Sequence, residues 1–127
     1  MSGIFGWLVS PRYARHDMHS VASSLFDALK ERGPDDQGYV VFDQSGALGG
    51  TENEPAKGDE GPVRLLLGQT HLAVMNLPAA GRLPIRSEDG RYTLAVNGEV
   101  FNSLELKQEL VGLGVHFRST ADSEVLL

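Results

Sequence analysis

Short runs of apolar residues punctuate the chain and are separated by stretches rich in glycine, proline and charged residues. The first run, Ile4–Val9, is apolar and aromatic and lies between Gly3 and Ser10–Pro11, which predicts a buried strand. Five later runs have the length and composition of further short strands. They are Tyr39–Asp43, Val63–Leu67, His71–Met75, Tyr92–Val96 and Val115–Arg118.

The first helix is predicted just after the first strand. Asp17 is a residue type that caps helix N-termini, and apolar residues then recur at helical spacing. These residues are Met18, Val21, Ala22, Leu25 and Leu29. The helix should end near Arg32, because Gly33–Pro34 cannot continue it. Residues 44–62 have little apolar content and are predicted to form a surface loop.

A second helix is predicted after Asn102, because Glu105 three residues later gives the pattern of a capping box. Gly112 or Gly114 should close this helix. Residues Asp122–Leu127 have the pattern of a helix that stops without a capping residue. We therefore expect either a shortened domain or a chain end that a partner covers.

Paired short strands interrupted by two helices indicate an α+β fold with a sheet layered by helices. The 127 residues suit one domain, 1–127. Lys and Arg total 11 against 17 Asp and Glu, a net charge of −6 that disfavours nucleic acid as a partner. No apolar run approaches the roughly 18 residues of a membrane span, and no secretion signal is recognisable.

Cysteine is absent, which excludes disulfides, thiolate metal sites and cysteine nucleophiles, and fits a cytoplasmic location. His16 and His19 lie three residues apart at a helix start, as two metal ligands could. No third ligand is suitably spaced. We therefore expect neither a metal nor a cofactor.

Five segments taken in order carry a recognisable pattern. They are Met1–Gly6, Arg32–Gly38, Gly68–Val74, Asn97–Asn102 and Ser119–Val125. Any one is common, but their order and spacing resemble the class II glutamine amidotransferase domain of asparagine synthetases and of related β-lactam and lasso-peptide cyclases. The resemblance covers nearly the whole chain. It implies an N-terminal-nucleophile αββα sandwich, of which this chain would hold only the first part.

The resemblance also implies a mechanism. In such enzymes Met1 is removed, and the next residue is a cysteine whose α-amine, with a pKa of roughly 7.7–8.0, acts as general base. The thiolate attacks the glutamine side-chain amide and releases ammonia. Asn97 and Gly98 would supply the oxyanion hole, and Glu99 and Asp122 would hold the glutamine α-ammonium. The loop containing Arg32 and Gly33 would form a wall of the site.

Each of these positions also has a structural interpretation. Asn97–Gly98 could be a tight turn that tolerates positive φ, and Glu99 could be a solvated turn residue. Asp122 could cap the terminal helix, and the Arg32 loop could simply end the first helix. His116, in a predicted strand, is interpreted as a half-buried sheet residue.

Two positions depart from the family pattern. Ser2 stands in the place of the catalytic cysteine, and a hydroxyl is a far weaker nucleophile than a thiol near pH 7. If Met1 is retained, the Ser2 nitrogen is an amide and cannot act as the base. His71 stands where the family has an arginine that grips the glutamine carboxylate, and histidine lacks that bidentate, permanently charged fork.

Three functions remain open on these grounds. The first is a non-catalytic amidotransferase-like subunit, binding glutamine at most weakly, that docks on or completes an ATP-dependent, amide-forming synthetase. The second is an inactivated or split fragment of a glutamine-hydrolysing synthetase. The third is a serine-type N-terminal hydrolase acting on another amide. The chain has no ATP-pyrophosphatase motif, so ATP is not expected to bind here. A hetero- or homo-oligomer is expected.

Overall fold

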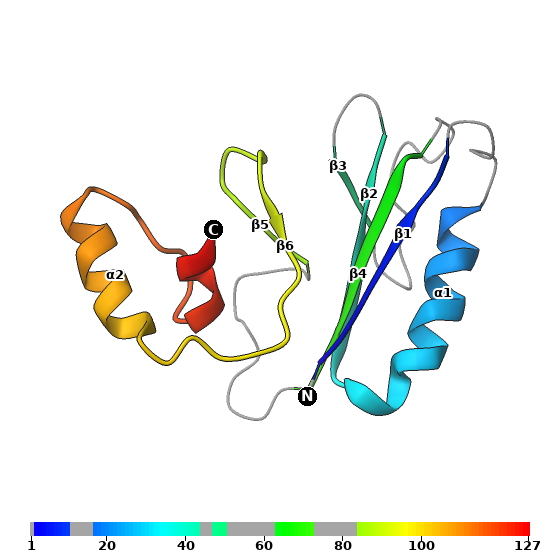
Figure 1. Cartoon of the computed structure of the whole chain (residues 1–127), viewed down its shortest axis with the longest axis horizontal. Helices are drawn as coiled ribbons and strands as arrows, with labels where there is room; N and C mark the ends of the chain where they lie inside the picture. Colours follow the sequence, from blue (N-terminus) through cyan, green and yellow to red (C-terminus); the bar gives the residue numbers. More distant parts are fainter. Residues whose placement is uncertain (1, 11–16, 44–46, 51–62, 73–83) are drawn as a thin grey trace.

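The computed structural model describes residues 2–10, 17–43, 47–50, 63–72 and 84–127. A four-stranded antiparallel sheet has the strand order β1-β4-β2-β3, and a separate hairpin pairs β5 with β6 (Figure 1). The sheet strands are β1 Gly3–Leu8, β2 Asp36–Phe42, β3 Ala47–Gly50 and β4 Leu65–His71. With two helices beside these strands, the predicted α+β class is confirmed.

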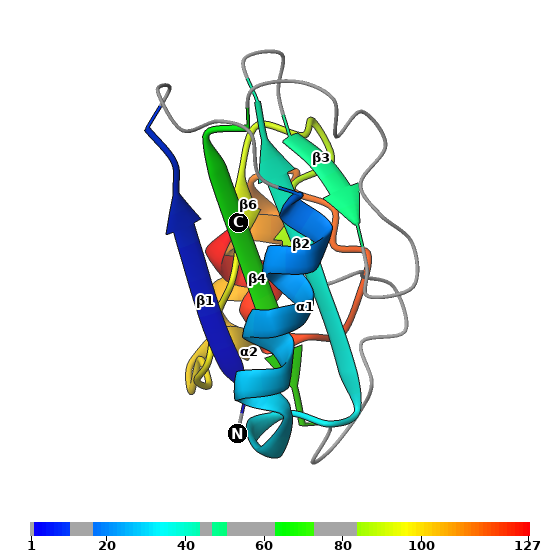
Figure 2. The ribbon, with the colours of Figure 1, turned by 90° about the vertical axis from the view of Figure 1, so that its right-hand side faces the viewer.

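Helix α1, Met18–Leu29, covers one face of the sheet (Figure 2). Asp17 caps it as predicted, since its Oδ1 accepts hydrogen bonds from the backbone N–H of His19 at 3.1 Å and of Ser20 at 3.3 Å. A short 3₁₀ helix, η2 (Lys30–Arg32), follows, and Gly33 ends it. The start and the end of this helical segment therefore agree with the sequence prediction.

The hydrophobic core lies between α1 and the sheet. The Phe5 ring of β1 meets the Phe26 ring of α1 edge to face, with 5.0 Å between centroids, and Tyr39 of β2 packs beside Phe26. Gly68 leaves the room for Phe5, because a Cβ on Gly68 would lie 2.0 Å from the nearest ring atom. The close packing of these side chains thus joins the helix to the sheet, and a change in the size of one of them would disturb it.

Two strand predictions have the wrong bounds. The sequence predicts separate strands at Val63–Leu67 and His71–Met75, yet β4 runs without a break from Leu65 to His71, and residues 73–75 lie outside the described residues. Gly68 is a contact point beneath Phe5 rather than a strand end. β3 also lies within residues 44–62, which the sequence predicts as a loop. The rest of that stretch lies outside the described residues.

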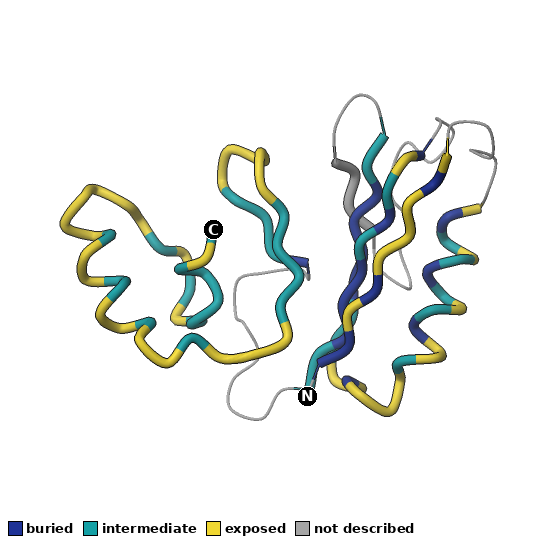
Figure 3. Tube along the Cα trace, viewed as in Figure 1, coloured by how far each residue is buried: buried dark blue, intermediate teal, exposed yellow. Residues whose placement is uncertain are grey.

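The second part of the molecule carries little buried surface (Figure 3). It contains β5 Ile85–Arg86, β6 Thr93–Leu94, α2 Ser103–Gly112 and a 3₁₀ helix, η3 Asp122–Leu126. Gly114, at a φ of 90°, closes α2 as predicted. The predicted strand Val115–Arg118 is irregular, and His116 is exposed rather than half-buried in a sheet. None of the described helices is long and apolar enough to cross a membrane.

Candidate functional site

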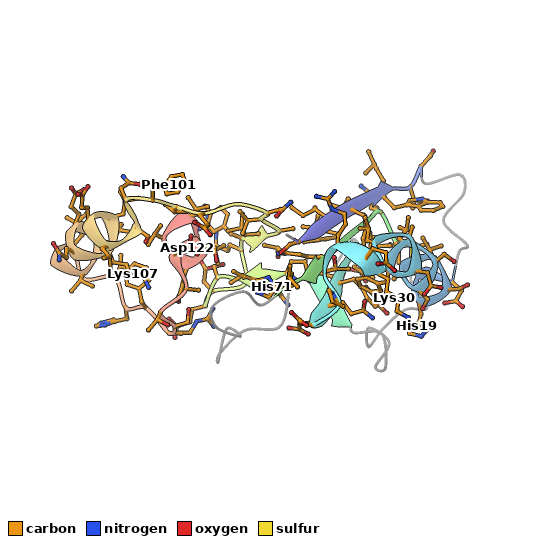
Figure 4. All side chains as sticks on the ribbon, turned by 90° about the horizontal axis from the view of Figure 1, so that it is seen from below. His19, Lys30, His71, Phe101, Lys107 and Asp122 are labelled. Atoms are coloured by element: carbon orange, nitrogen blue, oxygen red, sulfur yellow. The ribbon has the colours of Figure 1, made fainter. Side chains whose placement is uncertain are left out.

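His71 lies where the sheet meets the second part of the molecule, whereas Asp122 lies within that second part (Figure 4). Antiparallel pairing of β1 with β4 sets Gly3 opposite Thr70. The residue before β1 and the last residue of β4 therefore become neighbours. As a result the Ser2 Oγ and the His71 Nδ1 lie 3.1 Å apart, within hydrogen-bond distance.

The backbone around Ser2 is held from three directions. The Ser2 N–H donates to the Asn97 Oδ1 at 3.1 Å, and the Ser2 carbonyl accepts from the Arg32 Nε at 3.4 Å. The next N–H, of Gly3, donates to the Thr70 Oγ1 at 3.0 Å. Ser2 is only 7% exposed. The backbone at Ser2 is therefore held by contacts from distant parts of the chain.

The turn after η2 packs directly on His71. Pro34 forms a parallel bridge with His71, and the Asp35 N–H donates to the His71 carbonyl at 3.1 Å. A Cβ on Gly33 would lie 2.6 Å from the His71 backbone nitrogen, so this approach requires glycine. Arg32 and Gly33 thus end the helix and border the predicted site at the same time.

Asn97 reaches Ser2 through a contact that sequence reasoning missed. The Gln69 side chain lies in β4, is 2% exposed, and bonds the backbone of Val96 twice. Its Nε2 donates to the Val96 carbonyl at 2.7 Å, and its Oε1 accepts from the Val96 N–H at 3.2 Å. A polar residue inside an apolar strand was the available signal. Neither Asn97 nor Gly98 has positive φ, so they do not use the conformation that a tight turn would demand.

Asp122 and Glu99 lie on the segment that follows. The Asp122 Oδ2 accepts a hydrogen bond from the Val100 N–H at 2.7 Å, which ties η3 to the chain just after Glu99. Glu99 itself is exposed. Asp122 is the first residue of η3 and not its N-cap, which is Ala121 without a side-chain cap bond, so the capping interpretation of Asp122 is wrong.

The chemistry available at this junction is that of a serine hydroxyl beside an imidazole. While Met1 is retained, the Ser2 nitrogen is an amide, here donating to Asn97, and an amide nitrogen does not accept protons near pH 7. No cluster of three or more His, Cys, Asp or Glu suited to a metal occurs among the described residues. His16, one of the histidines considered for a metal, lies outside them.

Comparisons with known proteins place this geometry in context. Residues 58–127 match the family described as glutamine amidotransferase domain. The chain is 30% identical over 129 residues to asparagine synthetase [glutamine-hydrolyzing] 3 of Bacillus subtilis (strain 168), covering 100% of this chain and 17% of that protein. It is 30% identical to a probable asparagine synthetase [glutamine-hydrolyzing] of Acanthamoeba polyphaga mimivirus, covering 82% of this chain and 15% of that protein.

A relative named for a different activity also matches. The chain is 27% identical over 136 residues to an amidophosphoribosyltransferase of Rhizobium etli (strain ATCC 51251 / DSM 11541 / JCM 21823 / NBRC 15573 / CFN 42), covering 98% of this chain and 26% of that protein. No solved structure matches the chain significantly. The chain therefore spans a small fraction of the length of the curated relatives that it matches.

Proposed function

Since this chain belongs to the class II glutamine amidotransferase family related to asparagine synthetases, we propose that its function lies within amide-forming chemistry. Residues 1–127 act as an amidotransferase-like domain that does not hydrolyse glutamine. With respect to glutamine, the domain is a non-catalytic subunit that docks on or completes an ATP-dependent, amide-forming synthetase. Glutamine binds to it weakly at most. The cytoplasm is its proposed location.

The contact between Ser2 and His71 carries this proposal. A hydroxyl replaces the thiol, and the nitrogen that should act as base is an amide donating to Asn97. The imidazole at the position of the carboxylate-gripping arginine has its Nδ1 engaged with the Ser2 hydroxyl. Losing two charge-assisted hydrogen bonds, each worth about 1.5–3 kcal/mol, weakens glutamine binding by orders of magnitude.

The arrangement of layers and the exposed surface support the docking role. From one side of Figure 1 to the other lie α1, the four-stranded sheet, the β5–β6 hairpin and α2, the order that a first part of an αββα sandwich would have. Large apolar side chains are exposed on the α2 side, among them Phe101 at 95% and Leu113 at 81%. Exposed apolar surface of this kind is typical of protein interfaces.

Ammonia release from millimolar glutamine tests the catalytic half of the proposal. We expect no release above a buffer blank, with intact mass reporting whether Met1 is present. Ammonia release that Ser2→Ala abolishes would overturn the proposal.

The docking half is tested by co-expressing the chain with an ATP-dependent, amide-forming synthetase from the same organism. Phe101→Ser should weaken complex formation, whereas Glu88→Ser, at an exposed turn on the hairpin, should not.

A further inference from the structure

The Ser2–His71 contact also suggests an activity that does not involve glutamine. We propose that His71 is the general base for Ser2, and that the pair accepts an acyl group from small activated esters or thioesters. In the family mechanism the base is the nucleophile's own α-amine, which is an amide here while Met1 is retained. An imidazole nitrogen 3.1 Å from the hydroxyl oxygen is at the distance that a nucleophile and its base require.

Both partners of this pair are fixed before any substrate binds. The Ser2 backbone is bonded to Asn97 and Arg32, and His71 ends a strand paired on two sides, with Asp36 opposite it in β2. When the Nδ1 of His71 accepts a hydrogen bond from the Ser2 hydroxyl, the ring proton sits on Nε2. This is the tautomer that a base at this position needs. Such fixation lowers the entropic cost of bringing the two groups together.

The acyl transfer balances without any co-reactant except water. The Ser2 Oγ forms a bond to the acyl carbon while its proton passes to the His71 Nδ1, and the bond from carbon to the leaving oxygen or sulfur breaks. The proton on His71 then goes to the departing alkoxide or thiolate, which is released as an alcohol or thiol. Water attacks the acyl-serine with His71 again taking the proton, which yields the acid and restores the hydroxyl.

The surroundings of Ser2 favour small donors with good leaving groups. Ser2 is 7% exposed, which limits the acyl group to a small one. The contact with the Ser2 N–H uses the Asn97 Oδ1, so the side-chain NH₂ of Asn97 is not part of it. A phenolate or thiolate leaves as a stable anion, so His71 need not donate a proton to it as it leaves.

Acetylation of the full chain by p-nitrophenyl acetate, and its phosphonylation by an alkyl fluorophosphonate, test the proposal. Mass spectrometry should find one adduct, on the peptide containing Ser2, and none in Ser2→Ala. His71→Gln and His71→Ala should label about 100-fold more slowly or worse, the usual contribution of a general base. Added imidazole should restore the rate of His71→Ala, which a purely structural role would not allow. His116→Gln, at an exposed histidine, is the matched control and should label at the original rate.

Circular dichroism shows which variants are folded, and any conclusion rests on those. Equal labelling of wild type and His71→Gln would overturn the proposal, as would the absence of a Ser2 adduct in the folded wild type. A chain extended by several residues before Met1 should label normally; loss of labelling there would assign the base to a free α-amine. Glutamine hydrolysis measured in parallel reports on the proposed function separately, because Ser2 acylation requires no glutamine grip.

Discussion

The room for a side chain at a single position depends on whether the backbone of another segment lies against it. Gly33 and Gly98 both border the candidate site, but a Cβ on Gly33 would meet the backbone of His71 at 2.6 Å, whereas one on Gly98 would meet nothing within 4 Å among the described residues. The φ of neither glycine is positive, so only the space around each decides what a side chain does there. The two glycines form a matched pair for mutation.

We expect Gly33→Ala to destabilise the fold by about 1–3 kcal/mol, the usual cost of overpacking, because backbone atoms rather than a flexible side chain must shift. The shift would also move His71 away from Ser2. Gly98→Ala should change the free energy of unfolding by less than about 0.5 kcal/mol. Urea unfolding of both variants measures the difference, and equal destabilisation would mean that the turn after η2 does not rest on His71.

The sequence predicted candidate residues for the site but not how they meet. Ser2 and His71 were identified from the order of the motifs, yet their contact depends on the register of β1 with β4, which no local pattern specifies. Gln69 was missed for a related reason. Its role comes from the buried backbone groups of Val96, 27 residues away, which only the folded chain brings near.

At the scale of elements, helix boundaries were predictable and strand boundaries less so. Local side-chain bonding sets a helix start such as the one at Asp17, while strand extent depends on partners elsewhere in the sheet. β2 begins at Asp36, three residues before the predicted start at Tyr39, because β4 extends to His71 and pairs with it. The capping box predicted at Asn102 is wrong, since the Asn102 side chain makes no capping bond.

The two helix starts predict unequal effects of the same substitution. Asp17→Ala should lower the free energy of unfolding by about 1 kcal/mol, because the N–H groups of His19 and Ser20 lose their acceptor. Asn102→Ala should change it by less than about 0.5 kcal/mol, because no such bond exists there. Thermal unfolding followed by circular dichroism compares them. A larger cost at Asn102 would show that its side chain caps α2 in solution.

Glu124 ties η3 to the segment before it and should make that region sensitive to acid. Burial raises the pKa of Glu124, but hydrogen bonds from the Ser119 hydroxyl and from the N–H groups of Arg118 and Ser119 outweigh it, so the pKa lies below the ordinary 4.5. A lowered folded pKa means that this stabilisation is present above pH 4.5 and is lost as pH falls through the lowered value. Stability below pH 4.5 should therefore fall less steeply in Glu124→Gln than in wild type.

Urea midpoints measured between neutral pH and about pH 3 give the slope of stability against pH. Glu109→Gln, on the exposed side of α2, removes the same charge without touching these bonds. An equal change of slope in Glu109→Gln would attribute the effect to net charge instead of to the contacts of Glu124.

The whole molecule joins a well-packed part to one with little buried surface. α1 and the sheet enclose the core, and helix α2 contains no buried residue although it is described throughout. Polar contacts hold α2 in place, such as the Lys107 Nζ bond to the Ser119 carbonyl at 3.1 Å. The candidate site bridges the two parts through Gln69 and Asn97. A partner covering the apolar side chains near α2 would therefore also steady one wall of the site.

Hydrogen exchange should separate these two parts, because local opening costs least where few apolar contacts are broken. We expect the interior amides of α2 to exchange on the order of tenfold faster or more than those of α1, whose face includes Met18, Ala22 and Phe26 in the core. Phe26→Ala, at a cost of about 3–5 kcal/mol, should accelerate exchange in the sheet as well as in α1. Leu106→Ala, at a half-buried position, should accelerate amide exchange in α2 alone.

Equal protection of both helices in the wild type, or a loss of sheet protection in Leu106→Ala, would show that the chain unfolds as one cooperative unit. In that case, sedimentation at increasing concentration would test whether a second copy of the chain covers the exposed apolar surface near α2 in solution.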